Sequence, residues 1–168
     1  PAKWTYIGYV DADNNLDSFG DEDVNELEMI GSNANFHMVV LLDGMSNGDT
    51  AAYYIQQDAD SATITSPEIA LTDINPGWGS ELNMGDPQVA IDFVNYVYTN
   101  YPAEYYLWDM WDHGGSWLYG MCSDDTDNDD LTMLEVRHIY EQLRIDTGKI
   151  KLFDVAGYDQ CLMSDVSN

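Results

Sequence analysis

Apolar runs that predict buried strands alternate along this chain with segments that predict helices. Four runs have the length and apolar character of buried strands, and they lie at residues 4–10, 36–42, 105–111 and 149–157. Two shorter runs, at residues 51–56 and 61–65, flank a polar turn and predict a hairpin. Such alternation is typical of an α/β three-layer sandwich around a mostly parallel sheet, so we predict one domain of this class over residues 1–168.

Two segments in the first hundred residues carry the signals that start and end helices. Residues 21–23 are acidic and suit a first helical turn, apolar residues follow at three-residue spacing, and Gly31 ends the segment. Asp86 followed by proline predicts the start of a second helix, which continues to about Asn100.

A third predicted helix lies between the strands at residues 105–111 and 149–157 and indicates how they are connected. Thr132 and Glu135 form a capping-box pattern, and Gly148 ends the segment. Parallel strands need a crossover of about a dozen or more residues, usually a helix. We therefore expect these two strands to be parallel neighbours whose carboxyl ends meet at one edge of the sheet.

Side chains with catalytic potential follow both of these strands, His113 after the first and Cys161 after the second. A cysteine attacks as its thiolate, which a nearby imidazolium favours, and histidine can also protonate a leaving amine. Gly114 and Gly115 have no side chain, so their N–H groups could approach and stabilise an oxyanion. A cysteine near a strand end is more often a small buried hydrophobe, so these residues alone leave both readings open.

Five motifs occur in a characteristic order along the chain. They are ADNNLD at residues 12–17, NMGDP at 83–87, WDHGGSW at 111–117, CSDDT at 122–126 and DQCLM at 159–163. In order and spacing they resemble the clostripain family of cysteine peptidases, and the resemblance spans almost the whole chain. It implies a caspase-like fold, a Cys/His dyad, and cleavage after arginine or lysine through a thioester acyl-enzyme.

By position, the resemblance implies a role for each site residue. His113 would be the general acid and base, Cys161 the nucleophile, and the backbone N–H groups of Gly114 and Cys161 the oxyanion hole. Asp159 matches the acidic residue of the primary specificity pocket, where a carboxylate pairs with a basic side chain of the substrate. Asn14 lies in a loop that could form a wall of the cleft, and it is a second candidate for substrate binding.

Two positions depart from the family pattern, and the match fades after Met163. Ser116 stands where a third glycine is usual, and Gln160 stands where a small residue precedes the nucleophile, a change that bears on specificity more than on reaction type. The family continues beyond this point into a helix and further strands. We therefore expect a domain that is incomplete at its carboxyl end, with a second chain cut from the same precursor.

The charge of the chain limits the classes of molecule that it is expected to bind. It has 31 acidic and 5 basic residues, and the formal net charge of -26 disfavours nucleic acid and anionic membranes. Calcium, salt, and peptide or protein substrates that carry arginine or lysine are favoured instead. Hydrophobic residues make up 45% of the chain, enough for a folded core, and no run approaches the ~20 apolar residues that span a bilayer.

Acidity and family resemblance together favour a secreted, extracellular enzyme. We expect no organic cofactor. Because a nucleophile held in a disulfide would be inactive, we expect Cys122 and Cys161 to be free thiols.

An acidic run at residues 124–130 is a candidate calcium site. Asp125, Asp127 and Asp129 place carboxylates at alternate positions, as calcium-binding loops do, and clostripain-type enzymes are often calcium dependent. The run lacks the glycine and the final glutamate of an EF-hand, and a solvated loop or adaptation to salt explains it about equally well. The loop at residues 11–15 is a second candidate for calcium.

Two other functions remain open from the sequence. A catalytically inactive, calcium-binding extracellular module on the same fold is supported by Gln160 and by the missing carboxyl-terminal portion. A non-proteolytic cysteine hydrolase or amidase would use the same thiol and imidazole.

Overall fold

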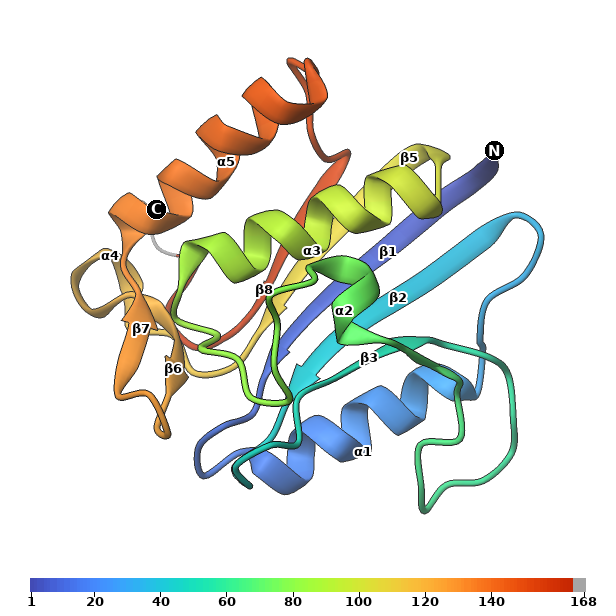
Figure 1. Ribbon diagram of the computed structural model, residues 1–168, viewed down its shortest axis with the longest axis horizontal. Helices are drawn as coiled ribbons and strands as arrows, with labels where there is room; N and C mark the ends of the chain where they lie inside the picture. The colour runs from blue at the N-terminus through green and yellow to red at the C-terminus, as the bar shows by residue number, and fades with distance from the viewer. Residues whose placement is uncertain (165–168) are drawn as a thin grey trace.

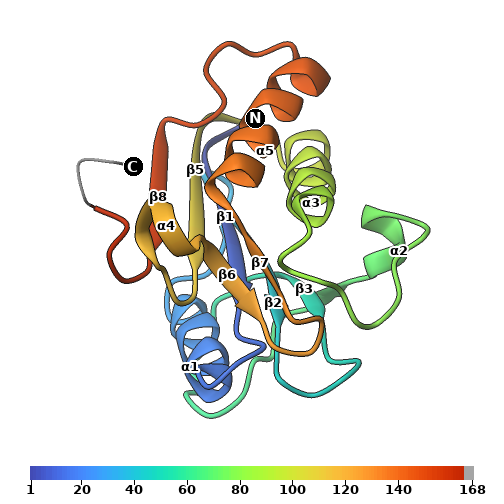
Figure 2. The same cartoon turned by 90° about the vertical axis from the view of Figure 1, so that its left-hand side faces the viewer.

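The computed structural model describes residues 1–164, which fold into three layers. A six-stranded sheet forms the middle layer, with α1 (Asp17–Glu28) on one face and α3 (Pro87–Asn100) and α5 (Met133–Thr147) on the other (Figure 1 and Figure 2). The predicted three-layer α/β sandwich is therefore confirmed. None of the helices in this part of the chain is long and apolar enough to cross a membrane.

The sheet has the strand order β4-β3-β2-β1-β5-β8. The bounds are β1 (Ala2–Asp11), β2 (Phe36–Asp43), β3 (Ala51–Tyr54), β4 (Glu68–Ile69), β5 (Ala103–Trp111) and β8 (Val155–Asp159). Strands β2, β1, β5 and β8 are parallel, and β3 and β4 extend one edge in the antiparallel direction. The shorter elements are α2 (Leu71–Ile74), α4 (Ser116–Tyr119), β6 (Met121–Asp124) and β7 (Asp129–Leu131).

Two hydrophobic cores lie on the two faces of the sheet. Successive side chains of a strand point to opposite faces, so Ile7 and Tyr9 of β1 pack in the core beneath α3 and α5, while Val10 packs with Val24 of α1. The central strands are therefore covered on both faces, which explains why their sequences are almost continuously apolar. This packing fixes the carboxyl ends of β1, β2 and β5 relative to one another.

The two later helices begin and end as the sequence predicts. The Asp86 side chain accepts a hydrogen bond from Gln88 N at the start of α3. At α5 the capping box of Thr132 and Glu135 is present, and Gly148 adopts the left-handed conformation with φ 66°.

The first helix begins earlier than predicted, at Asp17, and ends at Glu28. Gly20 lies inside the helix, where a Cβ would lie only 2.5 Å from the Ala12 Cβ. Glycine therefore allows the helix to cross close to the end of β1. Ile30 follows the helix and is 64% exposed, so it does not extend the apolar face as the spacing predicted.

The predicted hairpin is half correct. Strand β3 forms, but its antiparallel partner β4 lies at Glu68–Ile69 instead of residues 61–65. The backbone N–H groups of Thr65 and Ser66 donate to the Glu28 carboxylate. These backbone groups are bound to a side chain and do not pair in a strand ladder.

The last strand, β8, starts later than predicted, at Val155, and its parallel pairing with β5 is confirmed. The residues before it form a loop. Tyr106 N of β5 donates to the Asp154 carboxylate at 3.0 Å, so a side chain takes the place that a ladder partner would hold. The β6–β7 hairpin, which crosses the carboxyl end of the sheet, was not predicted, because its sequence reads as an acidic loop.

Candidate active site

The segments that carry His113 and Cys161 lie side by side at the carboxyl ends of β5 and β8. The register pairs Trp111, the last residue of β5, with Asp159, the last residue of β8. A Cβ on Gly114 would lie 2.4 Å from the Cys161 carbonyl oxygen, so only glycine allows this approach. The predicted convergence of the two segments is therefore present, and both side chains are exposed to solvent.

The imidazole of His113 is held by a residue that the sequence analysis did not select. Its Nε2 lies 2.9 Å from Oδ1 of Asn15, an arrangement in which the ring nitrogen donates to the amide oxygen. Asn15 lies in the loop after β1, which was predicted as a wall of the cleft. The available signal was the ADNNLD motif as a whole, but nothing in it distinguished Asn15 from Asn14.

Asn14 itself is 3% exposed and supports the site from within the protein. Its Nδ2 donates to Asp112 Oδ1 at 2.8 Å and to the Ser123 carbonyl at 2.9 Å, while its Oδ1 accepts from Leu16 N. The structure thus places Asn14 in a buried network and Asn15 at the surface beside the imidazole.

The carboxylate of Asp112 completes this network beneath the histidine. It accepts hydrogen bonds from Asn14 and from Ser123 N, at 2.8 and 2.5 Å. Burial raises the pKa of Asp112 from its ordinary value of 3.8 to about 6, although these hydrogen bonds oppose the increase. Asp112 therefore ties the ends of β1, β5 and β6 together.

The two cysteines are both free thiols, and they differ in environment. Cys161 is exposed, whereas Cys122 is fully buried, and burial raises the pKa of the Cys122 thiol well above its usual value. The Gln160 side chain points toward Cys122, with Nε2 3.4 Å from its sulfur. Gln160 thus contacts the buried thiol of Cys122.

The amide of the second glycine after His113 takes part in a turn. Gly115 N donates to the Gly120 carbonyl at 2.9 Å, so this amide stabilises a turn and is not available as an oxyanion donor. Ser116 has φ 62°, in the left-handed region that favours glycine, which gives a backbone reason for the glycine usual at this position in the family.

Asp159 lines a pocket of about 390 Å³ on the α1 face of the sheet. Tyr6, Asp109 and Trp111 line it together with Asp23 of α1. The Tyr6 hydroxyl donates to Asp109 at 3.1 Å, and the Trp111 indole donates to Asp23 at 2.7 Å. Burial, and then the nearby Asp159 charge, raises the pKa of Asp109, although Tyr6 opposes this. The pocket is therefore acidic and aromatic.

The acidic residues proposed for calcium lie in two different places. Asp125, Asp127 and Asp129 are exposed in and beside the β6–β7 turn. Across residues 1–164, the three-carboxylate group whose oxygens come within 4.8 Å of one another is instead formed by Asp13, Asp43 and Glu81. The structure does not bring the predicted three together in this way.

The charges of this group affect one another. Burial raises the pKa of Asp43 to about 8, the charges of Glu81, Asp124 and Asp13 add to the effect, and a hydrogen bond from Thr50 opposes it. Asp13 is in the loop that was the second candidate for calcium.

Comparison with known proteins agrees with this geometry. The model of the clostripain family matches residues 8–167. Clostripain from Hathewaya histolytica is 29% identical over an alignment of 188 residues, which covers 96% of this chain and 34% of that protein. The chain thus spans about a third of the length of this relative.

Two solved structures share the fold. A secreted C11 cysteine protease from Bacteroides thetaiotaomicron, in complex with an irreversible peptide inhibitor, superposes with a TM-score of 0.73 at 19% identity, over 97% of this chain and 44% of that one. An inactive zymogen C11 protease from Parabacteroides distasonis gives a TM-score of 0.64 at 20% identity, over 95% of this chain and 42% of that one. With the family model covering nearly all of its residues and the fold shared with two C11 proteases, the chain belongs to the clostripain family of cysteine peptidases.

Proposed function

We propose that this chain carries the catalytic dyad of a cysteine endopeptidase that cleaves after arginine or lysine. The observation that carries the proposal is the contact between Gly114 and the Cys161 backbone, which sets the histidine segment directly against the cysteine segment. An exposed thiol next to an exposed imidazole, at the end of a parallel sheet, is suited to nucleophilic attack on an amide.

In this mechanism the Cys161 thiolate attacks the scissile carbonyl carbon, and His113 takes up the thiol proton. Because Nε2 of His113 is bound to Asn15, Nδ1 is the nitrogen that exchanges protons with the thiol and the leaving amine. The backbone N–H groups of Gly114 and Cys161 stabilise the oxyanion. Release of the amine leaves a thioester on Cys161, and water hydrolyses it with His113 as the base.

The acidic pocket supplies the preference for a basic side chain. Asp159 is an exposed residue of the pocket lining, two residues before Cys161, so we assign the pocket to the side chain of the residue whose carbonyl is attacked. A carboxylate forms charge-assisted hydrogen bonds with guanidinium or ammonium groups, and aromatic rings such as those of Tyr6 and Trp111 attract cations.

We further propose a second chain from the same precursor as a partner. Within residues 1–164, β8 is at one edge of the sheet, and Val155 on it is 45% exposed. An apolar side chain on an open edge strand suits pairing with another segment. The relatives, of which this chain covers between a third and a half, have the length to supply one.

We also propose that the enzyme is secreted, as the relative from Bacteroides thetaiotaomicron is described. The formal net charge of -26 supports basic peptides as partners and disfavours nucleic acid and anionic membranes.

Peptides with arginine, lysine or norleucine before an aminocoumarin leaving group test the proposal. We expect cleavage of the basic substrates, loss of cleavage in Cys161→Ala, and retention in Cys122→Ala, which removes the buried thiol. Cleavage that persists in Cys161→Ala would contradict the assigned nucleophile. An absence of cleavage by the complete, processed wild-type protein would favour a non-catalytic module.

A further inference from the structure

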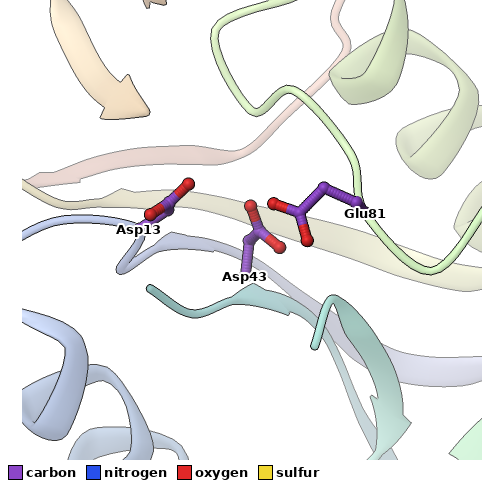
Figure 3. A group of neighbouring side chains, drawn as sticks. All are labelled: Asp13, Asp43 and Glu81. Atoms are coloured by element: carbon purple, nitrogen blue, oxygen red, sulfur yellow. The ribbon is translucent and has the colours of Figure 1, made fainter. Parts of the chain in front are cut away.

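Three carboxylates from separate parts of the chain converge beside the ends of β1 and β2. Asp13 follows β1, Asp43 ends β2, and Glu81 lies in the loop before α3 (Figure 3). Figure 3 shows the three side chains pointing toward one another, and one oxygen from each lies within 4.8 Å of the others.

One oxygen of each carboxylate is buried without a hydrogen-bond partner. These atoms are Oδ1 of Asp13, Oδ2 of Asp43 and Oε1 of Glu81, and the residues Asp13 and Asp43 are both 0% exposed. A buried carboxylate oxygen without a donor is costly, because it loses its water and gains nothing in return. Three such atoms in one place indicate a missing positive ligand.

The second oxygen of each carboxylate already accepts a hydrogen bond. Oδ2 of Asp13 accepts from Thr126 N at 3.0 Å, Asp43 accepts from the Thr50 hydroxyl, and Glu81 accepts from Gly48 N. Each carboxylate of the cluster thus has one oxygen that accepts a hydrogen bond and one that is buried without a donor.

Basic side chains of the described residues do not neutralise the cluster. The ion pairs among residues 1–164 join Lys3 to Glu104, Arg137 to Glu141 and Lys151 to Asp154. Further negative charge is close by instead, since Asp124 interacts with Asp13 and Asp11 with Asp43. Burying like charges this close together without a cation is strongly unfavourable.

We propose that Asp13, Asp43 and Glu81 form a binding site for a single calcium-sized divalent cation. Calcium takes oxygen ligands at about 2.3–2.6 Å, so two oxygens on one ion are at most about 5 Å apart, which the observed spacing satisfies. Magnesium requires shorter bonds of about 2.0–2.1 Å and near-ideal octahedral geometry, and three protein carboxylates in a dry cluster suit it less well.

The cation would join the loops that carry Asp13 and Glu81 to the end of β2, where the ladder between β1 and β2 ends at the Asp11–Asp43 pair. Asp13 lies in the loop that also carries Asn14 and Asn15, the partners of Asp112 and His113. Binding would therefore stabilise the loop that holds the imidazole. The proposal itself concerns binding and stability, and it holds whether or not the chain cleaves peptides.

Calcium titration of the purified protein tests the site after chelator treatment and desalting. We would use isothermal calorimetry and thermal unfolding in about 0.15 M KCl, which screens weak binding to a surface of high negative charge. We expect a saturable site and, at calcium concentrations of about 100 times the Kd, an increase of about 5–10 °C in Tm. Magnesium at the same concentration should give a smaller shift.

Conservative variants locate the ion. Glu81→Gln, on a partly exposed loop, should raise the calcium Kd at least about tenfold, and Asp43→Asn should remove the Tm shift. Without calcium, Asp43→Asn should unfold cooperatively at a Tm equal to or above that of the wild type, because asparagine keeps the shape of the side chain and carries no charge. The control is Asp125→Asn/Asp127→Asn, in the exposed turn, whose Kd should match the wild type.

Three results would overturn the proposal. The first is wild-type protein with neither binding heat nor a Tm shift, which would mean that protons neutralise the carboxylates. The second is calcium affinity unchanged in both Glu81→Gln and Asp43→Asn, or lost only in the control. The third is a magnesium shift equal to or larger than that of calcium.

Discussion

The carboxyl edge of the sheet carries two groups of reactive side chains that differ in exposure. At the ends of β5 and β8, His113 and Cys161 are open to solvent. At the ends of β1 and β2, Asp13 and Asp43 are fully buried and retain unpartnered oxygens. A nucleophile has to reach its substrate, whereas a structural cation is held best where protein oxygens replace water. On the two proposals above, one edge of the sheet combines an open catalytic site with a closed cation site.

The largest effect that separates the two groups is expected at the imidazole. His113→Ala should lower kcat on arginine substrates by about 10²–10⁴-fold with little change in stability, because it removes the proton carrier. Initial-rate measurements check this, and His138→Ala on the exposed face of α5 is the matched control. Equal losses in both variants would show that His113 has no special role.

The buried hydrogen bonds of Asn14 and Asp112, which lie between the two groups, should affect stability more than catalysis. Asn14→Ala should lower the free energy of unfolding by about 2–4 kcal/mol, because it leaves the buried Asp112 carboxylate short of a donor. Asn15→Ala, one residue further on and exposed, should change it by less than about 0.5 kcal/mol. Urea unfolding of the two variants measures this difference. Similar losses of unfolding free energy in Asn14→Ala and Asn15→Ala would contradict it.

The pH dependence of stability provides a third comparison. Because the pKa of Asp112 is raised to about 6 in the folded state, the folded protein binds this proton more tightly than the unfolded chain does. The stabilisation is fully present below the unfolded value and is lost as the pH rises through about 6. Relative to Asp112→Asn, the wild type should lose about 2 kcal/mol of unfolding free energy between about pH 4.5 and pH 7. Urea unfolding across this range measures it, with the exposed Asp73→Asn as the control, and parallel curves for all three proteins would contradict the shift.

The smallest effect concerns the substrate pocket. Asp159→Asn should lower kcat/KM for arginine and lysine peptides by about tenfold and leave the norleucine peptide unchanged, because it removes the charge that pairs with the substrate. Equal losses on all three substrates would indicate a general disturbance of the neighbouring Cys161 instead of a role in specificity.

The sequence predicts that the segments of His113 and Cys161 are neighbours, because the signals for the strands and the helix that position them are local. His113 and Cys161 each follow an apolar run, and Thr132 with Glu135 marks the helix that connects them. The strand at residues 36–42 and the helix from Asp86 to about Asn100 were predicted for the same reason.

Of the closed group, the sequence singles out only the loop that carries Asp13, because no local pattern marks Asp43 or Glu81. Asp43 and Glu81 are single acids in unrelated segments, and only the fold brings them to Asp13. The exposed acidic run in the β6–β7 turn attracts attention by composition alone. Likewise, Glu28 binds the backbone of Thr65 and Ser66 through a contact between distant segments, so the predicted second hairpin strand was wrong.

Identification of the thiol that reacts with an active-site label is the most direct test of the central claim. The folded wild-type protein would be treated with a peptidyl acyloxymethyl ketone ending in arginine, digested, and mapped by mass spectrometry. We predict a single adduct on Cys161, none on Cys122, and reaction at least about tenfold slower with the norleucine analogue. An adduct on Cys122, or equal rates with the two labels, would contradict the account.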